Sequence, residues 1–538
     1  MNDASFAGRR SFSWIIPALA SLCFACLSLA ILKYPGLQED EILFTAPMYM
    51  PALFRLKVWG VTVPLMLMGY LGTLKTWLYS AILEVFPPSR WAVRVPVVVA
   101  GVITIGLTWM WVRRVAGSRA AAFAVALLST DAVFIMTNTF DWGPVALQHV
   151  FLMGGLLAVQ IWIDGQASSG GGPHWFLAAG FFLWGLGLWD KALMIWPLTG
   201  LAIAAVCVYP RELRRHLKRV PLMIAAGSLL LGALPLVGYN LARHGETASA
   251  YAKFAADQLP RKLHELEYTL DGSVLLGPIV ATTPGLIAQT PATLVERLSV
   301  AVQRRFGEHA RNLMLPAIAL SLLCMVLQFR ATQFRILIFV LIAMTVAWLQ
   351  MAMNAGTGGG AHHVILLWPF PCIFVGISLA TAAERAPKII GRAVFAVAAL
   401  LVCGNVLNTN EYLADLILNG AVGGWTDAFY RLTGAVYPYR SGRIGIVDWG
   451  YQNGLHLISD GELKTAEVTD KDAIDWNAMV LVQHTDDNQL YSGVNDKLSS
   501  AAMAHGYTEQ VIRTVHDNQG RPVFEIFRFG AAGNQPAR

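Results

Sequence analysis

Long apolar blocks separated by short basic clusters are the feature that most limits what this chain can form. About 20 consecutive apolar residues are enough for a helix to cross a bilayer. Only 14% of the 538 residues are charged and the mean hydropathy is +0.51, whereas about 25% of residues are charged in an ordinary soluble domain. The sequence therefore predicts an α-helical polytopic membrane protein with about 11 transmembrane helices. The blocks lie near residues 13–32, 92–112, 120–138, 144–163, 175–189, 192–209, 220–240, 313–329, 336–353, 364–382 and 393–407.

The basic residues and the cysteines fit this class. The formal net charge is only +6, and Lys and Arg lie between the apolar blocks, so the sequence favours no nucleic-acid partner. All six cysteines lie inside apolar blocks, where we expect buried apolar side chains rather than a disulfide or a zinc site. The first block follows Arg9 and Arg10 and is too long for a cleaved signal peptide, so we expect it to remain as a membrane anchor.

The distribution of Lys and Arg predicts which side of the membrane each loop faces. With a cytoplasmic N-terminus, the basic clusters occupy alternate loops on the inner side: Arg113 to Arg119, Arg211 to Arg219, Arg330 to Arg335, and Arg385 to Arg392. The outer face, taken here as the periplasmic face of a bacterial inner membrane, then receives residues 33–91, 241–312 and 356–363 and the chain after about residue 410.

The first outer loop, residues 33–91, is amphipathic rather than simply polar. Its apolar stretch Val58 to Tyr70 is interrupted by Gly60, Pro64 and Gly69, a pattern that predicts helices lying along the membrane surface. A twelfth span in this loop is the alternative. It would turn the later basic clusters outward, which the preference for inner basic loops disfavours.

A change in composition near residue 410 divides the chain into a transmembrane domain, 1–409, and a small extracytoplasmic α/β domain, 410–538. Neither a GxGxxG motif nor a P-loop occurs in the second domain. Short β-branched runs and helical patterns predict its elements. The expected strands are Arg443–Val447, Met479–Gln483, Tyr507–Val515 and Pro522–Phe529, and the expected helices are Gly450–Ile458 and Asn495–His505.

Three consecutive acidic residues, Glu39, Asp40 and Glu41, follow the first span directly. A carboxylate in a partly desolvated site can have a raised pKa suited to accepting a proton, or it can bind a hard divalent cation. The other interpretation is a solvated loop that ends a helix. We interpret the triplet as the strongest signal of chemistry in the chain.

Several cationic side chains are expected at the same face. Lys75 and Arg94 could bind a phosphate, Lys as a point charge and Arg through two parallel bonds. Lys191 follows the fifth span, and His362 and His363 follow a glycine-rich stretch. For an isolated Lys or Arg the alternative is a side chain that extends to the membrane surface, and for the two histidines we expect one to contact phosphate or metal while the other packs.

Two further acidic residues lie in or beside the third span. Asp141 stands at its outer end in the stretch Phe-Asp-Trp-Gly-Pro, and Asp131 lies earlier in the chain and deeper in the span. An acid within a span is a functional candidate by default, although neighbouring hydroxyls could equally satisfy Asp131. We favour Asp141 as a site residue.

Taken together, these motifs resemble the polytopic GT-C glycosyltransferases, the superfamily of the protein O-mannosyltransferases and the aminoarabinose transferases. The resemblance rests on the acidic pair Asp40 and Glu41, the lysine Lys75 ahead of Arg-Val-Pro, and the stretch Phe140 to Gln148. It is clearest over residues 36–160. The chain departs from the family pattern with Lys-Thr-Trp-Leu at 75–78, where many relatives have Lys-Pro-Pro-Leu, and with His-His-Val at 362–364, where relatives often carry Arg-Tyr.

The resemblance implies an enzyme that transfers a sugar, hexosyl or pentosyl, from a polyprenyl phosphate to an acceptor hydroxyl with inversion. By this resemblance Asp40 would be the base or a metal-binding acid with Glu41 beside it, and Lys75 would contact the donor phosphate, with His363 as a further candidate. The residues themselves add Asp141 as a candidate catalytic acid, and they add Arg94, Lys191 and His362 as candidate contacts of the donor phosphate. A divalent metal, if one is used, would bind Asp40 or His362, and no other cofactor is implied.

Besides the lipid donor and membrane lipids, the implied partner is a protein, glycan or lipid acceptor that the sequence does not identify. Two other functions remain open at this point: a flippase for lipid-linked sugars, and a catalytically inactive assembly subunit on the same fold. A flippase should carry charges near the middle of the bilayer. The charged residues of this chain instead gather at one face, which favours an enzyme.

Overall fold

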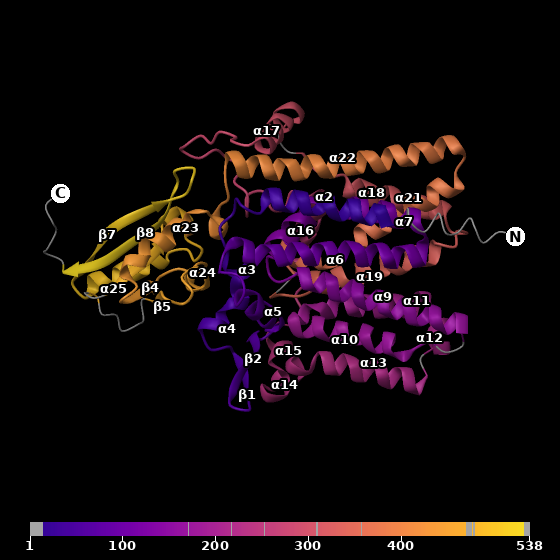
Figure 1. The fold of residues 1–538 in the computed structure, drawn as a ribbon, viewed down its shortest axis with the longest axis horizontal. Coiled ribbons are helices and arrows are strands. Elements are labelled where there is room, and N and C mark those ends of the chain that lie inside the picture. Colours follow the sequence, from indigo (N-terminus) through magenta and orange to yellow (C-terminus); the bar gives the residue numbers. More distant parts are fainter. Residues whose placement is uncertain are drawn as a thin grey trace.

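The computed structural model describes residues 14–169, 172–216, 218–251, 253–307, 310–356, 358–469, 476 and 479–531. It consists of a helical bundle with a five-stranded sheet at one end (Figure 1). Each of the eleven apolar blocks coincides with a helix or with two helices joined by a bend. The bundle helices are α2 (Ile15–Ile31), α6 (Arg90–Ala116), α7 (Ser118–Leu128), α8 (Ala132–Phe140), α9 (Ala146–Ser169), α10 (His174–Asp190), α11 (Ile195–Val208), α13 (Arg219–Gly232), α14 (Leu234–Ala242), α18 (Met314–Leu327), α19 (Phe334–Ala352), α21 (Phe370–Arg385) and α22 (Lys388–Leu418).

Not every block forms a helix that is long enough to cross a membrane by itself. Among the described residues, five helices are sufficiently long and apolar, or up to eight when each of three bent pairs counts as one span. The pair α7 and α8, for example, bends by 66° at Asp131, whose side chain accepts a hydrogen bond from Phe134 N and begins α8. The remaining blocks form the shorter helices α2, α10 and α18. The count of about 11 spans therefore stays a prediction.

The loop after the first apolar helix, residues 33–91, differs from the expected surface helices. Residues 54–72 form three antiparallel strands, β1 (Phe54–Val58), β2 (Val61–Met68) and β3 (Leu71–Gly72). Trp59 and Gly60 connect the first two strands, with φ of 47° and 84°. Two consecutive residues with positive φ match the right-handed twist of a hairpin. The glycine that suggested a break in a helix instead makes a hairpin turn, so the expectation of helices here was wrong.

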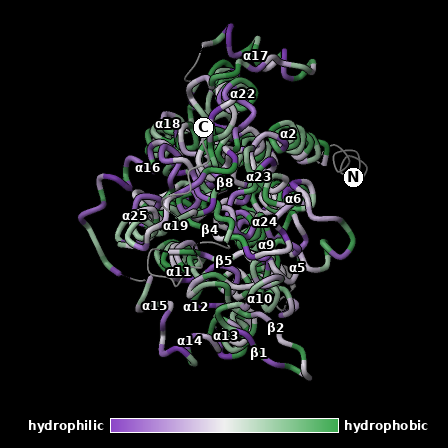
Figure 2. Tube along the Cα trace, turned by 90° about the vertical axis from the view of Figure 1, so that its left-hand side faces the viewer, coloured by the Kyte–Doolittle hydropathy of each residue, from purple (hydrophilic) through white to green (hydrophobic). Residues whose placement is uncertain are grey.

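Short helices complete the first loop and the segment 241–312. They are α3 (Glu39–Ile42), α4 (Ala46–Tyr49), α5 (Leu74–Leu83), α15 (Glu246–Tyr251), α16 (Leu259–Asp271) and α17 (Leu294–Phe306). A further short helix, α20 (Ala361–Val364), carries His362 and His363. Seen from the side of the C-terminal sheet, the loops between the apolar helices are hydrophilic (Figure 2).

The C-terminal sheet has the order β5-β4-β6-β8-β7. Its central strands β4, β6 and β8 run through a core that is covered on one face by α23 and α24 and on the other by α25. The four expected strands and two expected helices all form, with ends that differ by a few residues, and β5 is an additional strand. The elements are α23 (Ala428–Val436), β4 (Arg443–Ile446), α24 (Gln452–Ile458), β5 (Lys464–Glu467), β6 (Val480–His484), α25 (Val494–Ala504), β7 (Tyr507–His516) and β8 (Pro522–Ala531).

The boundary between the two parts lies later than residue 410. Helix α22 continues to Leu418, and its last turns are buried, so the chain leaves the bundle only after residue 418. The C-terminal part then packs directly on the first loop. Leu37, Ile42 and Phe44 share one apolar core with Phe429 and Leu455 of the C-terminal part.

The bundle places the basic cluster of α12 (Pro210–His216) at the end opposite the C-terminal sheet (Figure 1). If basic loops face the cytoplasm, reporter fusions after Arg215 and after Arg443 should give opposite signals. Alkaline phosphatase activity, which requires export, should appear only with the second fusion. Equal signals from the two fusions would contradict this topology.

Candidate active site

The three consecutive acidic residues after the first span point in three directions. Gln38 caps the short helix α3, because its Oε1 accepts hydrogen bonds from the backbone N–H of Asp40 (2.6 Å) and of Glu41 (3.2 Å). Successive side chains on a helix diverge by about 100°. Glu39 therefore contacts the C-terminal part of the chain, and Glu41 contacts the transmembrane bundle. Asp40 lies between them and lines a cavity.

Glu41 forms a buried ion pair with Arg94 of α6. Arg94 donates from Nε to Oε1 of Glu41 at 2.6 Å and from Nη2 to Oε2 at 2.8 Å, and neither side chain is exposed. The other Arg94 donors bind the carbonyls of Leu32, Pro35 and Gly36. A guanidinium has five N–H donors, and all five are used here. Arg94 therefore holds the first loop instead of presenting a free group to a phosphate.

Glu39 contacts the C-terminal part of the chain. Its carboxylate accepts hydrogen bonds from the backbone N–H of Asn453 (3.3 Å) and from the Asn453 side-chain amide. Burial raises the pKa of Glu39 to about 8, so near pH 7 the side chain is largely protonated and adds little charge beside Asp40. Asn453 lies on α24, and this contact joins the two parts immediately beside Asp40.

Asp40 is the member of the triplet that faces a cavity. The cavity has a volume of about 10 Å³, roughly that of one water molecule, and Lys75, Asp190 and Pro144 also line it. Trp142 Nε1 donates to Asp40 Oδ2 at 3.2 Å. Burial raises the pKa of Asp40, and the bond from Trp142 opposes that shift. A partly buried carboxylate that has a raised pKa and lines a cavity is suited to accept a proton.

Lys75 and Asp141 form a second buried ion pair. Lys75 Nζ lies 2.7 Å from Asp141 Oδ2 and 3.3 Å from the carbonyl oxygen of Glu41. Asp141 has a φ of 49°, and its Oδ1 accepts from the backbone N–H of Val145 and of Ala146, both at 2.8 Å. Asp141 thus ends α8, and its side chain holds the start of α9 and fixes Lys75 at the edge of the cavity. It does not face the cavity itself.

Lys191, near Asp40, has fewer hydrogen-bond partners than Arg94 or Lys75. It is buried and donates to the carbonyl oxygen of Gly143, and among the residues that the structure describes it belongs to no ion pair. An ammonium group has three donors, so two remain. The neighbouring Asp190 accepts from Gln148 Nε2 at 2.8 Å. Lys191 is therefore better placed than Arg94 to bind an additional anion.

The two histidines occupy different environments. The His362 ring lies over Trp142, with ring centroids 4.7 Å apart, which places it next to the indole that contacts Asp40. His363 lies edge-on to Trp196 at 6.3 Å. His362 Nδ1 and both ring nitrogens of His363 are buried without a hydrogen-bond partner in the described part of the chain. His362 belongs to the site, whereas His363 packs behind it.

The residues around Asp40 do not form a set of metal ligands. Within the described ranges, no group of three or more His, Cys, Asp or Glu side chains converges on a point that could hold a metal ion. Glu39 and Glu41 are bound to Asn453 and Arg94. The expected divalent metal at Asp40 or His362 thus lacks a protein ligand set, and no step of the proposed reaction is assigned to it.

Comparison with known proteins supports the resemblance. The family model described as dolichyl-phosphate-mannose-protein mannosyltransferase matches residues 72–239. The structure of ArnT from Cupriavidus metallidurans bound to undecaprenyl phosphate aligns with a TM-score of 0.57 and 13% identity over 98% of this chain and 99% of that chain. The chain has the GT-C glycosyltransferase fold. ArnT in the apo state aligns with a TM-score of 0.55 and 12% identity over 99% of this chain and 100% of that chain.

The solved structures confirm the GT-C fold that was expected from the sequence motifs, and the family model adds a similarity over residues 72–239. A comparison with curated protein sequences found no match. At 12–13% identity the ArnT structures show the fold, and the roles of individual residues have to come from the geometry of this chain.

Four side chains that sequence analysis did not select help to build the site: Gln38, Trp142, Gln148 and Asn453. Trp142 and Gln148 lie within the stretch 140–148 that carried the resemblance, so their position offered a signal. No sequence signal pointed to Asn453, because it contacts Glu39 from a position 414 residues later in the chain.

The contact between Glu39 and Asn453 leads to a prediction. Asn453→Ala should lower the transfer rate by roughly tenfold or more, because a small displacement of a reacting group is costly. Asn488→Ala is the matched control, since Asn488 contacts only Thr485 and Pro522 of its own domain. Steady-state rates of both purified variants test this prediction. Equal rates would show that the C-terminal part does not position Asp40.

Proposed function

We propose that the chain transfers a sugar from a polyprenyl-phosphate donor to an acceptor hydroxyl, with inversion, at the membrane face that carries the C-terminal sheet. The observation that carries the proposal is the partly buried Asp40 carboxylate at a cavity that Lys75 also lines. The GT-C fold agrees with a lipid-linked donor, since the ArnT protein of the same fold binds undecaprenyl phosphate in its structure.

In the proposed reaction, Asp40 accepts the proton of the acceptor hydroxyl while the hydroxyl oxygen attacks the anomeric carbon. The bond from this carbon to the phosphate oxygen breaks, and the phosphate leaves with the electron pair on the opposite side of the sugar. Lys191 and Lys75 stabilise the negative charge of the leaving phosphate. The chain itself forms no covalent bond to the sugar.

The other predicted site residues take supporting roles in this proposal. Glu41 and Arg94 hold the first loop against α6, and Asp141 orients Lys75. His362 supports the Trp142 indole. His363 does not contact Asp40 or its hydrogen-bond partner, so we no longer assign it to the phosphate. Of the phosphate contacts expected from the sequence, the proposal keeps Lys191 and drops Arg94.

Product analysis tests the function. Purified protein in detergent is incubated with radiolabelled polyprenyl-phosphate sugars and cell-envelope fractions, and labelled products are separated into lipid, glycan and protein. We expect label to move from the donor to one of these classes, with wild-type protein but not with Asp40→Asn. Movement of intact labelled donor across reconstituted vesicles without transfer would instead support the flippase.

The environment of Asp40 predicts the pH dependence of the rate. A base must be deprotonated to act, so kcat/KM falls as the pH drops through the pKa of Asp40. Burial raises that pKa, so the loss begins at a higher pH than for an exposed aspartate. Trp142→Phe removes a hydrogen bond that lowers the pKa of Asp40. The fall of kcat/KM at low pH, the acid limb of the pH profile, should therefore move to a higher pH in this variant. An acid limb at the same pH in both proteins would contradict the role of Asp40.

A further inference from the structure

Helix α17 has three distinct stripes along its length. Glu296, Ser299, Val300 and Gln303 are buried against the bundle, while the apolar side chains of Leu294, Val295, Leu298 and Phe306 are 57–66% exposed. Arg297 and Arg304 form the third stripe, and Arg305 lies on the exposed apolar stripe, near Leu294 and Leu298. A helix with one apolar stripe and one cationic stripe is typical of segments that lie in a membrane surface.

Polar contacts fix the depth of α17 relative to the bundle. Glu296 accepts hydrogen bonds from Lys33 Nζ (2.7 Å) and from Tyr34 OH (2.9 Å), immediately after the end of α2. Gln303 Nε2 donates to Asp415 Oδ1 at 2.8 Å, near the end of α22. The helix thus lies where two bundle helices emerge on the side of the C-terminal sheet. Figure 2 shows it at the periphery of the bundle beside α22.

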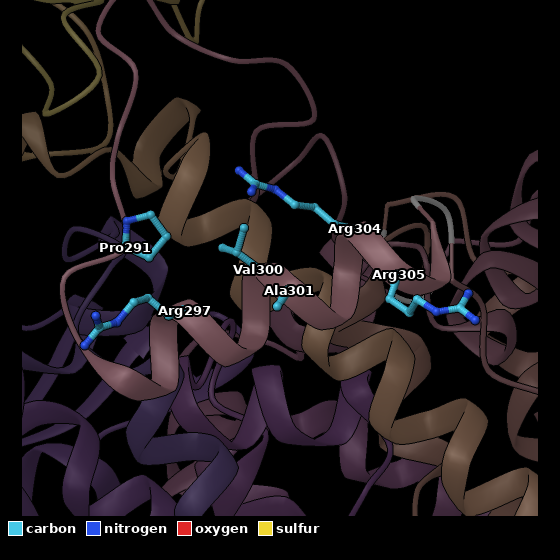
Figure 3. Close-up of a pocket in the computed structure, with 6 residues that line it drawn as sticks. All are labelled: Pro291, Arg297, Val300, Ala301, Arg304 and Arg305. Carbon is cyan, nitrogen blue, oxygen red and sulfur yellow. The ribbon is translucent and has the colours of Figure 1, made fainter.

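The three arginines line an open pocket of about 640 Å³ together with Pro291, Val300 and Ala301. Figure 3 shows Arg297 and Arg304 extending toward the side of the pocket where Pro291 lies, and Arg305 pointing the other way. Within the described part of the chain, none of the three forms an ion pair. They contrast with Arg94, Arg311 and Arg521, which each pair with a carboxylate.

We propose that α17 binds the phosphate of an anionic lipid headgroup in the leaflet on the side of the C-terminal sheet. Arginine binds phosphate oxygens through its fork of donors, and the exposed apolar stripe fits the acyl chains of the same leaflet. Three positive charges that form no ion pair with the described residues complement one or two phosphates. A soluble anion would account for the arginines but not for Leu298 and Phe306 on the adjacent stripe.

Lipid titration of the full-length protein tests this proposal independently of sugar transfer. The protein in a nonionic detergent is titrated with phosphatidylglycerol or phosphatidylcholine, and bound lipids are counted by native mass spectrometry alongside the melting temperature. We expect wild-type protein to prefer phosphatidylglycerol. The triple variant Arg297→Gln, Arg304→Gln, Arg305→Gln should bind it roughly 100-fold more weakly, as follows from about 1 kcal/mol per arginine near an anionic surface.

A matched control removes three exposed arginines of the C-terminal part, Arg443→Gln, Arg513→Gln, Arg528→Gln, and should bind phosphatidylglycerol like wild type. An unchanged melting temperature without lipid establishes that the α17 variant is folded. If it does not fold, the double variant Arg304→Gln, Arg305→Gln replaces it. Equal binding of the two lipids, undiminished binding by the α17 variant, or an equal stabilisation by inorganic phosphate at the same concentration would overturn the proposal.

Discussion

Asp40→Asn is expected to lower the rate of sugar transfer by roughly 10²–10⁴-fold, the contribution of a general base, while the protein stays folded. Asparagine keeps the shape of the side chain, and its carbonyl oxygen can still accept the bond from Trp142 Nε1. The backbone bond from Asp40 N to Gln38 is unaffected. Only the charge and the ability to take a proton are lost.

Single-turnover rates of purified Asp40→Asn and wild type, together with melting temperatures in detergent, check this expectation. Asp496→Asn makes the same chemical change at an exposed position of α25 and should leave the rate unchanged. Near-normal turnover by a folded Asp40→Asn protein would remove Asp40 from the mechanism and would favour an assembly subunit without catalytic activity.

The second large effect is expected from the ion pair between Lys75 and Asp141. Lys75→Met leaves the Asp141 carboxylate buried without its cation, and breaking a buried pair from one side costs about 3–5 kcal/mol. Asp141 also holds the start of α9, so the damage should extend to that helix. We therefore expect Lys75→Met to have a much lower melting temperature in detergent than wild type. The same substitution at a lysine that only extends to the membrane surface would not have this effect.

The double variant Lys75→Met, Asp141→Asn separates stability from donor binding. It removes both charges, and asparagine can still accept at Oδ1, so most of the lost stability should return. If Lys75 also contacts the donor phosphate, this folded protein should bind the donor roughly tenfold to more than a hundredfold more weakly, as expected for about 1.5–3 kcal/mol. Wild-type donor affinity in the double variant would limit Lys75 to a structural role and leave Lys191 as the phosphate contact.

Local sequence patterns were sufficient to predict much of the secondary structure. Apolar blocks of helical length predicted the positions of the bundle helices, and β-branched runs predicted β4, β6, β7 and β8, because burial and strand preference act within a few residues. The hairpin was missed for a local reason as well. Trp59 and Gly60 adopt positive φ, and a single glycine in an apolar run is compatible with a broken helix or with a turn.

The sequence by itself determined that this is a chain of membrane helices with an acidic triplet at the end of the first span and cations nearby. Only the tertiary structure decided which carboxylate faces the cavity. Glu39 and Glu41 are committed to Asn453 and Arg94, which lie 414 and 53 residues away. A buried polar or charged group requires a partner. Partners so distant in the chain are determined by the packing of α24 and α6 around the first loop, which no local sequence pattern shows.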